Sequence, residues 1–129
     1  MSVAATHQAD SALNRAISDA MVELYAIFYQ HDRTTATTYI NDNIVVCLLE
    51  NILTAGEDTL IADGARGEVI DGRVAFQTKS EDEFTATIER LTHRRVTAFL
   101  SANQTMPGVA CELFFLDAAP LTAHGRGED

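Results

Sequence analysis

Five basic side chains stand at two similar points of the sequence and could together bind an anion. His31 and Arg33 follow the first amphipathic segment, and His93, Arg94 and Arg95 follow the last one. Arginine guanidinium groups form charge-assisted hydrogen bonds with anionic groups, and histidine can supply a further donor. These residues are candidates for an anion site or for a contact with an acidic partner. The alternatives are cations that complement helix C-terminal dipoles or, for the two histidines, a shared metal or proton site.

No other arrangement of reactive residues in the sequence is complete. Cys47 and Cys111 lie in apolar runs, where we expect buried thiols that pack as small hydrophobic side chains. The sequence has no nucleophile elbow, no phosphate-binding glycine loop and no zinc-type spacing of cysteine and histidine. We therefore expect no catalytic residue, no metal site and no cofactor. A less favoured alternative is an enzyme whose site forms only between two copies of the chain.

Composition limits the possible partners. The chain has 129 residues, of which 47% are hydrophobic, and it carries 9 basic against 19 acidic side chains, a net charge of −10. This balance argues against nucleic acid and against direct binding to anionic lipid, because both require clustered Lys and Arg. The sequence has no apolar run long enough for a membrane span and no secretory signal. We expect a cytoplasmic protein without direct membrane insertion, one that reaches a membrane only through a partner.

The elements that would position these residues begin with a helix and a hairpin. Apolar residues recur every three or four positions from Leu13 to Phe28, which predicts an amphipathic helix that begins near Asp10 or Ser11. The segment 34–40, a turn at 41–43 and the apolar run 44–49 predict a β-hairpin whose second strand is central in the sheet. A capping box formed by Thr54 and Glu57 predicts a short helix that stops at Gly64.

The second half of the chain is partly ambiguous. Asp71-Gly72 between apolar residues is typical of a hairpin, but the apolar spacing over 67–79 also fits a helix that continues through 81–93. A strand at 95–101, a turn from Asn103 to Gly108 and a strand at 109–116 follow. The expected fold is α+β, in the order helix, hairpin, two helices, hairpin (αββααββ), with a four-stranded antiparallel sheet packed by long helices. Residues 11–117 form the single domain, and residues 1–10 and 118–129 are expected to be disordered tails.

Self-association is also expected. Long amphipathic helices beside a small sheet with two free edges favour a homodimer. Tyr25, Phe28 and Tyr29 cluster at the end of the first helix, where core packing is favoured over an interface patch.

Several stretches resemble a bacterial family of unknown-function domains. They are the segments 17–22, 38–50 (TYINDNIVVCLLE), 53–57 (LTAGE) and 91–101 (LTHRRVTAFLS). The named branch of this family is MpsC-like, after a subunit of a sodium-translocating, membrane-potential-generating system, and the resemblance covers about residues 11–117. It implies a helix through 67–93 and a soluble accessory subunit beside membrane subunits that move ions or bicarbonate. It implies no catalytic residues.

From the residues and the resemblance together we expect a non-enzymatic accessory or regulatory protein whose partners are membrane transport subunits. The alternative is a small-anion or ion-sensing protein with a site near Arg33, Arg94, Arg95, His31 and His93. That alternative requires these side chains to meet in one pocket.

Overall fold

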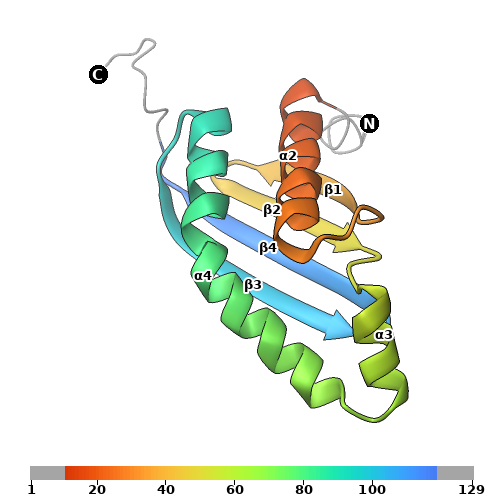
Figure 1. Cartoon of the computed structure of the whole chain (residues 1–129). Helices are drawn as coiled ribbons and strands as arrows, with labels where there is room; N and C mark the ends of the chain where they lie inside the picture. Colours follow the sequence, from red (N-terminus) through yellow and green to blue (C-terminus); the bar gives the residue numbers. More distant parts are fainter. Residues whose placement is uncertain (1–10, 119–129) are drawn as a thin grey trace.

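The computed structural model describes residues 11–118, apart from the side chains of Phe76, Gln77 and Lys79. A four-stranded antiparallel sheet in the order β1-β2-β4-β3 forms one layer, and α2 and α4 lie side by side across one of its faces (Figure 1). The α+β class and the four-stranded antiparallel sheet are thus confirmed, as is the central position of β2. The elements are, in chain order, α2 (Ala12–Tyr29), β1 (Thr35–Asn41), β2 (Ile44–Glu50), α3 (Ala55–Ala62), α4 (Arg66–Thr92), β3 (Val96–Thr105) and β4 (Gly108–Leu116).

Helix α2 is fixed at its start by a side-chain cap and along its length by an apolar stripe. The Ser11 hydroxyl accepts a hydrogen bond from the backbone N–H of Asn14 at 3.1 Å, as an N-cap residue should. The stripe residues Ile17, Met21 and Tyr25 are fully buried against the sheet. The helix ends at Gln30, which adopts a left-handed conformation with a φ of 52°.

The strands alternate between an inner face, which the helices cover, and an outer face. Cys47 of β2 lies between Thr38 of β1 and Glu112 of β4 in the register, and all three are fully buried. Their neighbours along each strand point to the opposite side. The core therefore lies between the inner face and the helices, and consists of Ile17, Met21, Tyr25, Val45, Cys47, Leu49, Ile52, Phe84, Ile88, Ala110, Phe114 and Leu116.

Cys111 corrects one sequence expectation. We expected both cysteines to be buried, but Cys111 is only partly buried. The register places Glu112 opposite Cys47, so the residue that faces the core in β4 is Glu112, while Cys111 lies on the outer face. Adjacent residues of a strand point to opposite faces, so Cys111 lies outside although Glu112 lies inside.

The ambiguous segment 67–80 is helical. Helix α4 runs without a break from Arg66 to Thr92, so the Asp71-Gly72 hairpin does not form and Ser80 does not start a new helix. Val69, Arg73 and Ser80 are spaced by four and seven residues and are all buried on one side of this helix. Packing of that side overrides the local turn preference of Asp-Gly.

The second hairpin has a shorter turn than the sequence predicts. We expected a turn from Asn103 to Gly108, whereas β3 continues to Thr105 and β4 begins at Gly108, which leaves Met106 and Pro107 as the turn. Gly108 is needed because a Cβ there would lie 2.7 Å from the Leu53 side chain. The capping box of Thr54 and Glu57, with α3 ending before Gly64, is confirmed. The predicted tails lie outside the described residues, apart from Ala118.

Candidate functional site

The five basic residues singled out from the sequence are not brought together. His31 and Arg33 lie before the start of β1, whereas Arg94 binds the backbone of Asp42, just after the end of β1. β1 has seven residues, and at about 3.3 Å per residue it separates the two groups by roughly 20 Å. A single pocket that contains all five is therefore excluded by the fold, although each group alone stays a candidate for a partner contact.

Arg94 has structural hydrogen bonds that the sequence did not reveal. Its guanidinium donates to the backbone oxygen of Asp42 at 2.9 Å and to that of Asp117 at 2.6 Å. These bonds join the β1–β2 turn to the end of β4, beside the C-terminus of α4. His93 is the left-handed C-cap of α4 with a φ of 58°, and Arg95 is exposed next to it.

The other basic pair borders a hollow of mixed charge. His31 Nε2 lies 2.6 Å from the backbone oxygen of Asn51. The hollow beside it has a volume of about 340 Å³, and Arg33 shares its lining with the carboxylates of Glu50 and Asp58. Two carboxylates next to one arginine oppose the binding of a small anion.

A buried ion pair, which the sequence analysis missed, holds α3 against α4. Arg73 is only 2% exposed, and its guanidinium donates to Glu57 from Nη2 at 2.7 Å and from Nε at 2.9 Å. Arg73 also donates to the backbone oxygen of Ile52, and its guanidinium carbon lies 4.1 Å from the centre of the Tyr29 ring. Burial raises the pKa of Glu57, but hydrogen bonds from Arg73 and Thr54 outweigh it and leave this pKa below its usual value.

A second buried carboxylate lies next to this pair. The Tyr25 hydroxyl donates to Glu112 Oε2 at 2.6 Å, and the rings of Tyr25 and Tyr29 are 5.1 Å apart. Burial, and next the charge of Glu112, raise the pKa of Tyr25 far above its usual value, so Tyr25 stays protonated. A line of polar contacts thus runs from Glu112 on β4 to Arg73 on α4. Three surface hollows among residues 11–118 are lined by other side chains, and we assign this buried network a structural role.

A sequence signal for this network existed in β4. The strand reads Val-Ala-Cys-Glu-Leu-Phe-Phe-Leu, and a single carboxylate inside an apolar strand needs a hydrogen-bonding partner if it faces inward. Arg73 gave no such signal, because an arginine between Gly72 and Val74 is unremarkable in an exposed helix.

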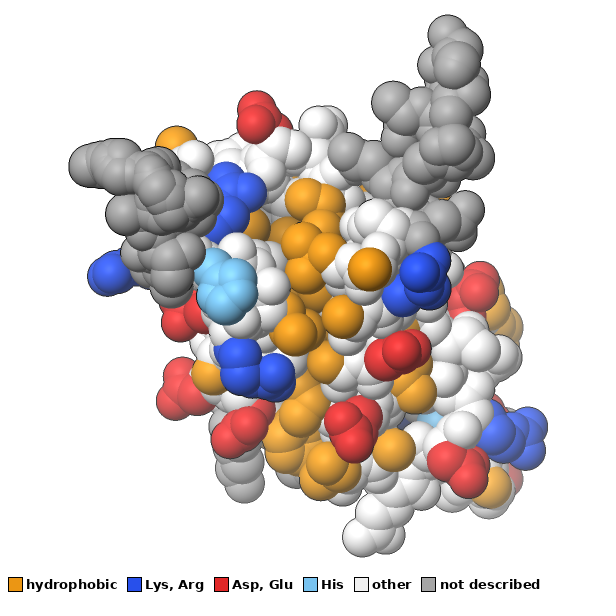
Figure 2. Space-filling model, turned by 90° about the horizontal axis from the view of Figure 1, so that it is seen from above, with side chains coloured by type: hydrophobic (Ala, Val, Ile, Leu, Met, Phe, Trp, Pro, Cys, Tyr) orange, Lys and Arg blue, Asp and Glu red, His pale blue; other side chains and the backbone are white. Residues whose placement is uncertain are grey.

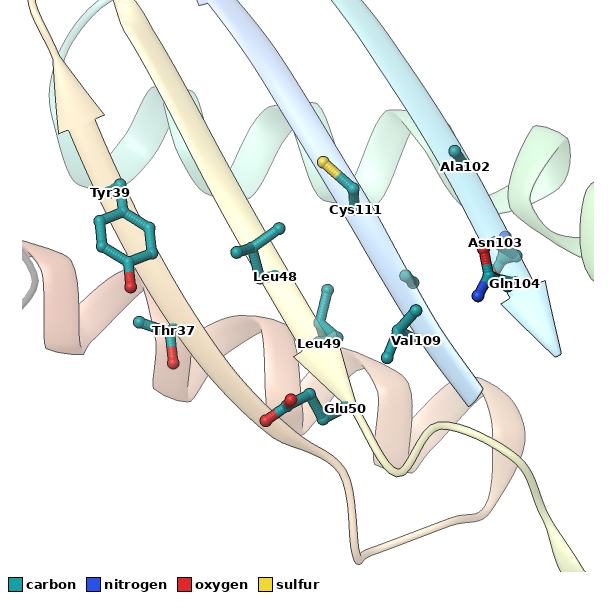
Figure 3. Close-up of a pocket in the computed structure, with 11 residues that line it drawn as sticks. Thr37, Tyr39, Leu48, Leu49, Glu50, Ala102, Asn103, Gln104, Val109 and Cys111 are labelled. Carbon is teal, nitrogen blue, oxygen red and sulfur yellow. The ribbon is translucent and has the colours of Figure 1, made fainter. Parts of the chain in front are cut away.

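The outer face of the sheet is apolar and has no covering element among residues 11–118. Figure 3 views this face, with the helices behind the strands, and shows Tyr39, Leu48 and Cys111 projecting from it. Exposed fractions of 43% for Tyr39, 42% for Leu48 and 60% for Leu100 are high for large hydrophobic side chains. A shallow hollow of about 610 Å³ lies on this face, where Ala102, Val109 and Cys111 contribute small side chains.

A second apolar surface lies on the helix side. Figure 2 shows hydrophobic side chains gathered in a band between α2 and the C-terminal half of α4, with charged side chains along both margins. Ile27 of α2 is 63% exposed, and the partly buried Leu24, Phe28 and Leu91 continue from it into the core. Acidic residues occupy exposed positions of both helices: Asp19, Glu23, Glu81, Asp82 and Glu83.

Neither a metal-binding cluster nor a thiol of lowered pKa is found within residues 11–118. Within residues 11–118, no group of three or more His, Cys, Asp or Glu side chains is placed to hold a metal ion. Burial raises the pKa of the Cys47 thiol to about 12, so this group is protonated at neutral pH and is a poor nucleophile. No helix within the described part of the chain is both long enough and apolar enough to cross a membrane.

Comparison with known proteins gives one match. The family model described as the Na+-translocating membrane potential-generating system (MpsC) matches residues 9–118, which is most of the chain. A search of curated proteins and a search of solved structures each found no match.

Proposed function

The chain belongs to this MpsC family, and from that premise we propose that it is a non-enzymatic accessory subunit of a sodium-translocating, membrane-potential-generating system. In this proposal the protein is cytoplasmic and reaches the membrane through a polytopic partner subunit. The observation that carries the proposal is the helix-side band between α2 and α4, which is apolar along its centre and bordered by charged side chains of both signs.

The charge of this surface favours a basic partner. The chain carries a net charge of −10, and the exposed Glu23 lies one helical turn from the exposed Ile27 on α2. Cytoplasmic loops of membrane proteins are enriched in Lys and Arg, so they offer the opposite charge. A basic amphipathic segment of such a loop can place its apolar residues between α2 and α4 and its cations beside Asp19 and Glu23.

The competing function, an anion sensor built from all five basic residues, has weaker support. Its residues form two groups at opposite ends of β1, and the group at His31 is accompanied by Glu50 and Asp58.

The test is capture of tagged protein with detergent-solubilised membranes of its own organism, compared among three chains. Ile27→Glu puts a charged side chain in the apolar centre of the band, where the partner's apolar residues would pack, and the charge would be costly to bury there. Met106→Glu is the matched control on the β3–β4 turn, where Met106 is 66% exposed. We expect wild type and Met106→Glu to recover one polytopic subunit at similar yield, and Ile27→Glu to recover at least about tenfold less, which corresponds to roughly 1.4 kcal/mol. Recovery should fall in high salt, because charge attraction is screened.

Function is read out as the sodium-dependent membrane potential of vesicles that contain the recovered subunit. Addition of wild-type chain should raise this potential, and addition of Ile27→Glu should not. Capture of no polytopic membrane protein would contradict the accessory role. Equal capture by Ile27→Glu and wild type would leave the accessory role standing but remove the helix-side band from it.

A further inference from the structure

The outer face of the sheet carries the apolar side chains that are typical of a buried surface. Strand β2 reads Ile-Val-Val-Cys-Leu-Leu, apolar on both of its sides, which is typical of a strand buried on both faces. Within residues 11–118 the helices cover the inner side only, through Val45, Cys47 and Leu49. The outer side keeps Leu48 and, on neighbouring strands, Tyr39 and Leu100 exposed.

We propose that this outer face is the interface of a homodimer, in which two copies of the chain pack sheet against sheet. Such a dimer has four layers, with the helices outside and two apolar sheet faces at the centre. Sheets that pack face to face lie about 10 Å apart with interdigitated side chains. The helix-side band, which carries the proposed membrane partner, stays accessible in this arrangement.

The near absence of charge on the outer face favours a second copy of the chain there over a basic partner. The outward positions of strands β1 to β4, all of them within the described residues, include one charged side chain, Glu50, at the end of β2. A basic segment would find no carboxylates to pair with across the centre of this face. A second copy carries the same net charge of −10, and a nearly uncharged face is where two such chains can approach with least repulsion.

The relief of the face is compatible with a two-fold contact. Tyr39, Leu48 and Leu100 project, whereas the hollow of about 610 Å³ is partly floored by the small side chains of Ala102 and Cys111. In a symmetric dimer both copies present the same patch, so each supplies projections and a hollow to its partner. The projecting side chains of each copy can therefore enter the hollow of the other copy.

The size of the face is sufficient for a specific dimer. β1 has seven residues and β3 has ten. Strands spaced about 4.8 Å apart, with about 3.3 Å per residue, give four such strands a face of roughly 500 Å². Two copies then bury on the order of 1,000 Å², which is about the minimum area of a biological interface.

The experiment is sedimentation equilibrium of the full chain over a range of concentrations. Wild type should sediment at twice the mass of one chain at micromolar concentration. Leu100→Glu adds a charge at an edge-strand position that is already 60% exposed, and it should raise the dimer Kd at least about 100-fold. Ile27→Glu is the matched control, since Ile27 is equally exposed at 63% but lies on the helix side, and it should remain dimeric.

A second variant covers the case in which a charge on β3 prevents folding. Leu100→Ala removes the side chain without adding charge and should raise the Kd about tenfold, with a circular dichroism spectrum like that of wild type. A wild-type chain that is monomeric at about 100 μM overturns the proposal, as does a dimer that Leu100→Glu leaves intact while Ile27→Glu dissociates it. Failure here leaves the accessory role untouched, because that role is tested by capture with Ile27→Glu and not by chain mass.

Discussion

The inner and outer faces of the sheet are built by the same four strands, yet they are occupied differently. On the inner face Cys47, Leu49 and Phe114 are fully buried beneath α2 and α4. On the outer face Leu48 and Leu100, from the same or neighbouring strands, remain exposed. The two faces are similarly apolar, so hydrophobicity alone does not say which one the helices cover. A large exposed apolar face on a folded chain points to a neighbour, and this is the basis of the dimer proposal.

The two faces also differ in where they keep polar groups. The inner side encloses Glu112 with Tyr25, and the buried ion pair of Arg73 with Glu57 joins α4 to α3. The outer side has Glu50 at its end and apolar or uncharged side chains elsewhere along the strands. Buried charges need fixed partners, which the inner side supplies within one chain. The outer side has no such requirement and can be covered or uncovered without leaving a charge unpaired.

The largest expected effect on the free energy of unfolding is that of replacing Phe114, whose neighbour Phe115 points to the opposite face of the sheet. Phe114 is fully buried on the inner face, and Phe115 is partly buried on the outer face. We expect Phe114→Ala to lower the free energy of unfolding by about 4 kcal/mol, through lost burial and a cavity. Phe115→Ala should lower it by less than about 2 kcal/mol, because its ring is already partly in water. Urea unfolding at a concentration where the chain is monomeric measures both, and equal losses would contradict the distinction between the faces.

The second largest loss of unfolding free energy is expected when the buried ion pair of Arg73 and Glu57 is broken. Arg73→Met removes the cation that pairs with the Glu57 carboxylate and the guanidinium that donates to the Ile52 carbonyl, and should lower the free energy of unfolding by about 3 kcal/mol. Arg66→Met, at an exposed position of the same helix, is the control and should change stability by less than about 0.5 kcal/mol.

A double substitution separates the pair from simple loss of packing. Arg73→Met combined with Glu57→Gln should cost clearly less than the sum of the two single changes, because the carboxylate left unpaired in Arg73→Met is gone. Gln at position 57 can still accept the hydrogen bond from the Thr54 backbone that closes the capping box. Additive losses would show that Arg73 acts through packing alone.

The smallest expected effect is on acid sensitivity. The pKa of Glu57 is lowered in the folded chain, so its ionised form stabilises the fold above the pKa that it has when unfolded. That stabilisation should be lost as the pH falls through the folded pKa. Glu57→Gln should therefore flatten the decline of unfolding free energy on the acid side of pH 5, while Glu68→Gln, at an exposed site of α4, should leave it unchanged. A curve that is identical for wild type and Glu57→Gln would remove the ion pair from the acid response.

Local signals in the sequence were sufficient for much of the architecture. The Ser11 cap, the Thr54 and Glu57 capping box and the turn at 41–43 are each decided by groups a few residues apart, and the structure has all of them. The continuous apolar run 44–49 likewise predicted β2, and the segment 109–116 was expected as the last strand, which is β4 in the structure.

Other features depend on packing between residues that are far apart in the sequence, so local signals could not predict them. Asp71-Gly72 favours a turn on its own, yet it lies in a helix because Val69 and Arg73 are buried on one side of it. The partners of Arg73 are 16 and 21 residues away, and Glu112 meets Tyr25 across 87 residues, so no local spacing could have paired them. The grouping of the five basic residues failed for the same reason. Similar positions relative to helices place them at opposite ends of β1.

The most direct measurement is the rate at which the two cysteines react with a thiol reagent at pH 8, as a function of protein concentration. Burial raises the pKa of Cys47 to about 12 beneath the helices, whereas Cys111 lies on the outer face. In dilute solution Cys111 should react at once and Cys47 only when the chain unfolds. In concentrated solution, where the outer faces meet, labelling of Cys111 should slow at least about tenfold, and Cys111→Ser should have no fast-reacting thiol at any concentration. Labelling of Cys111 at one rate across all concentrations, or labelling of Cys47 as fast as Cys111, would contradict the account.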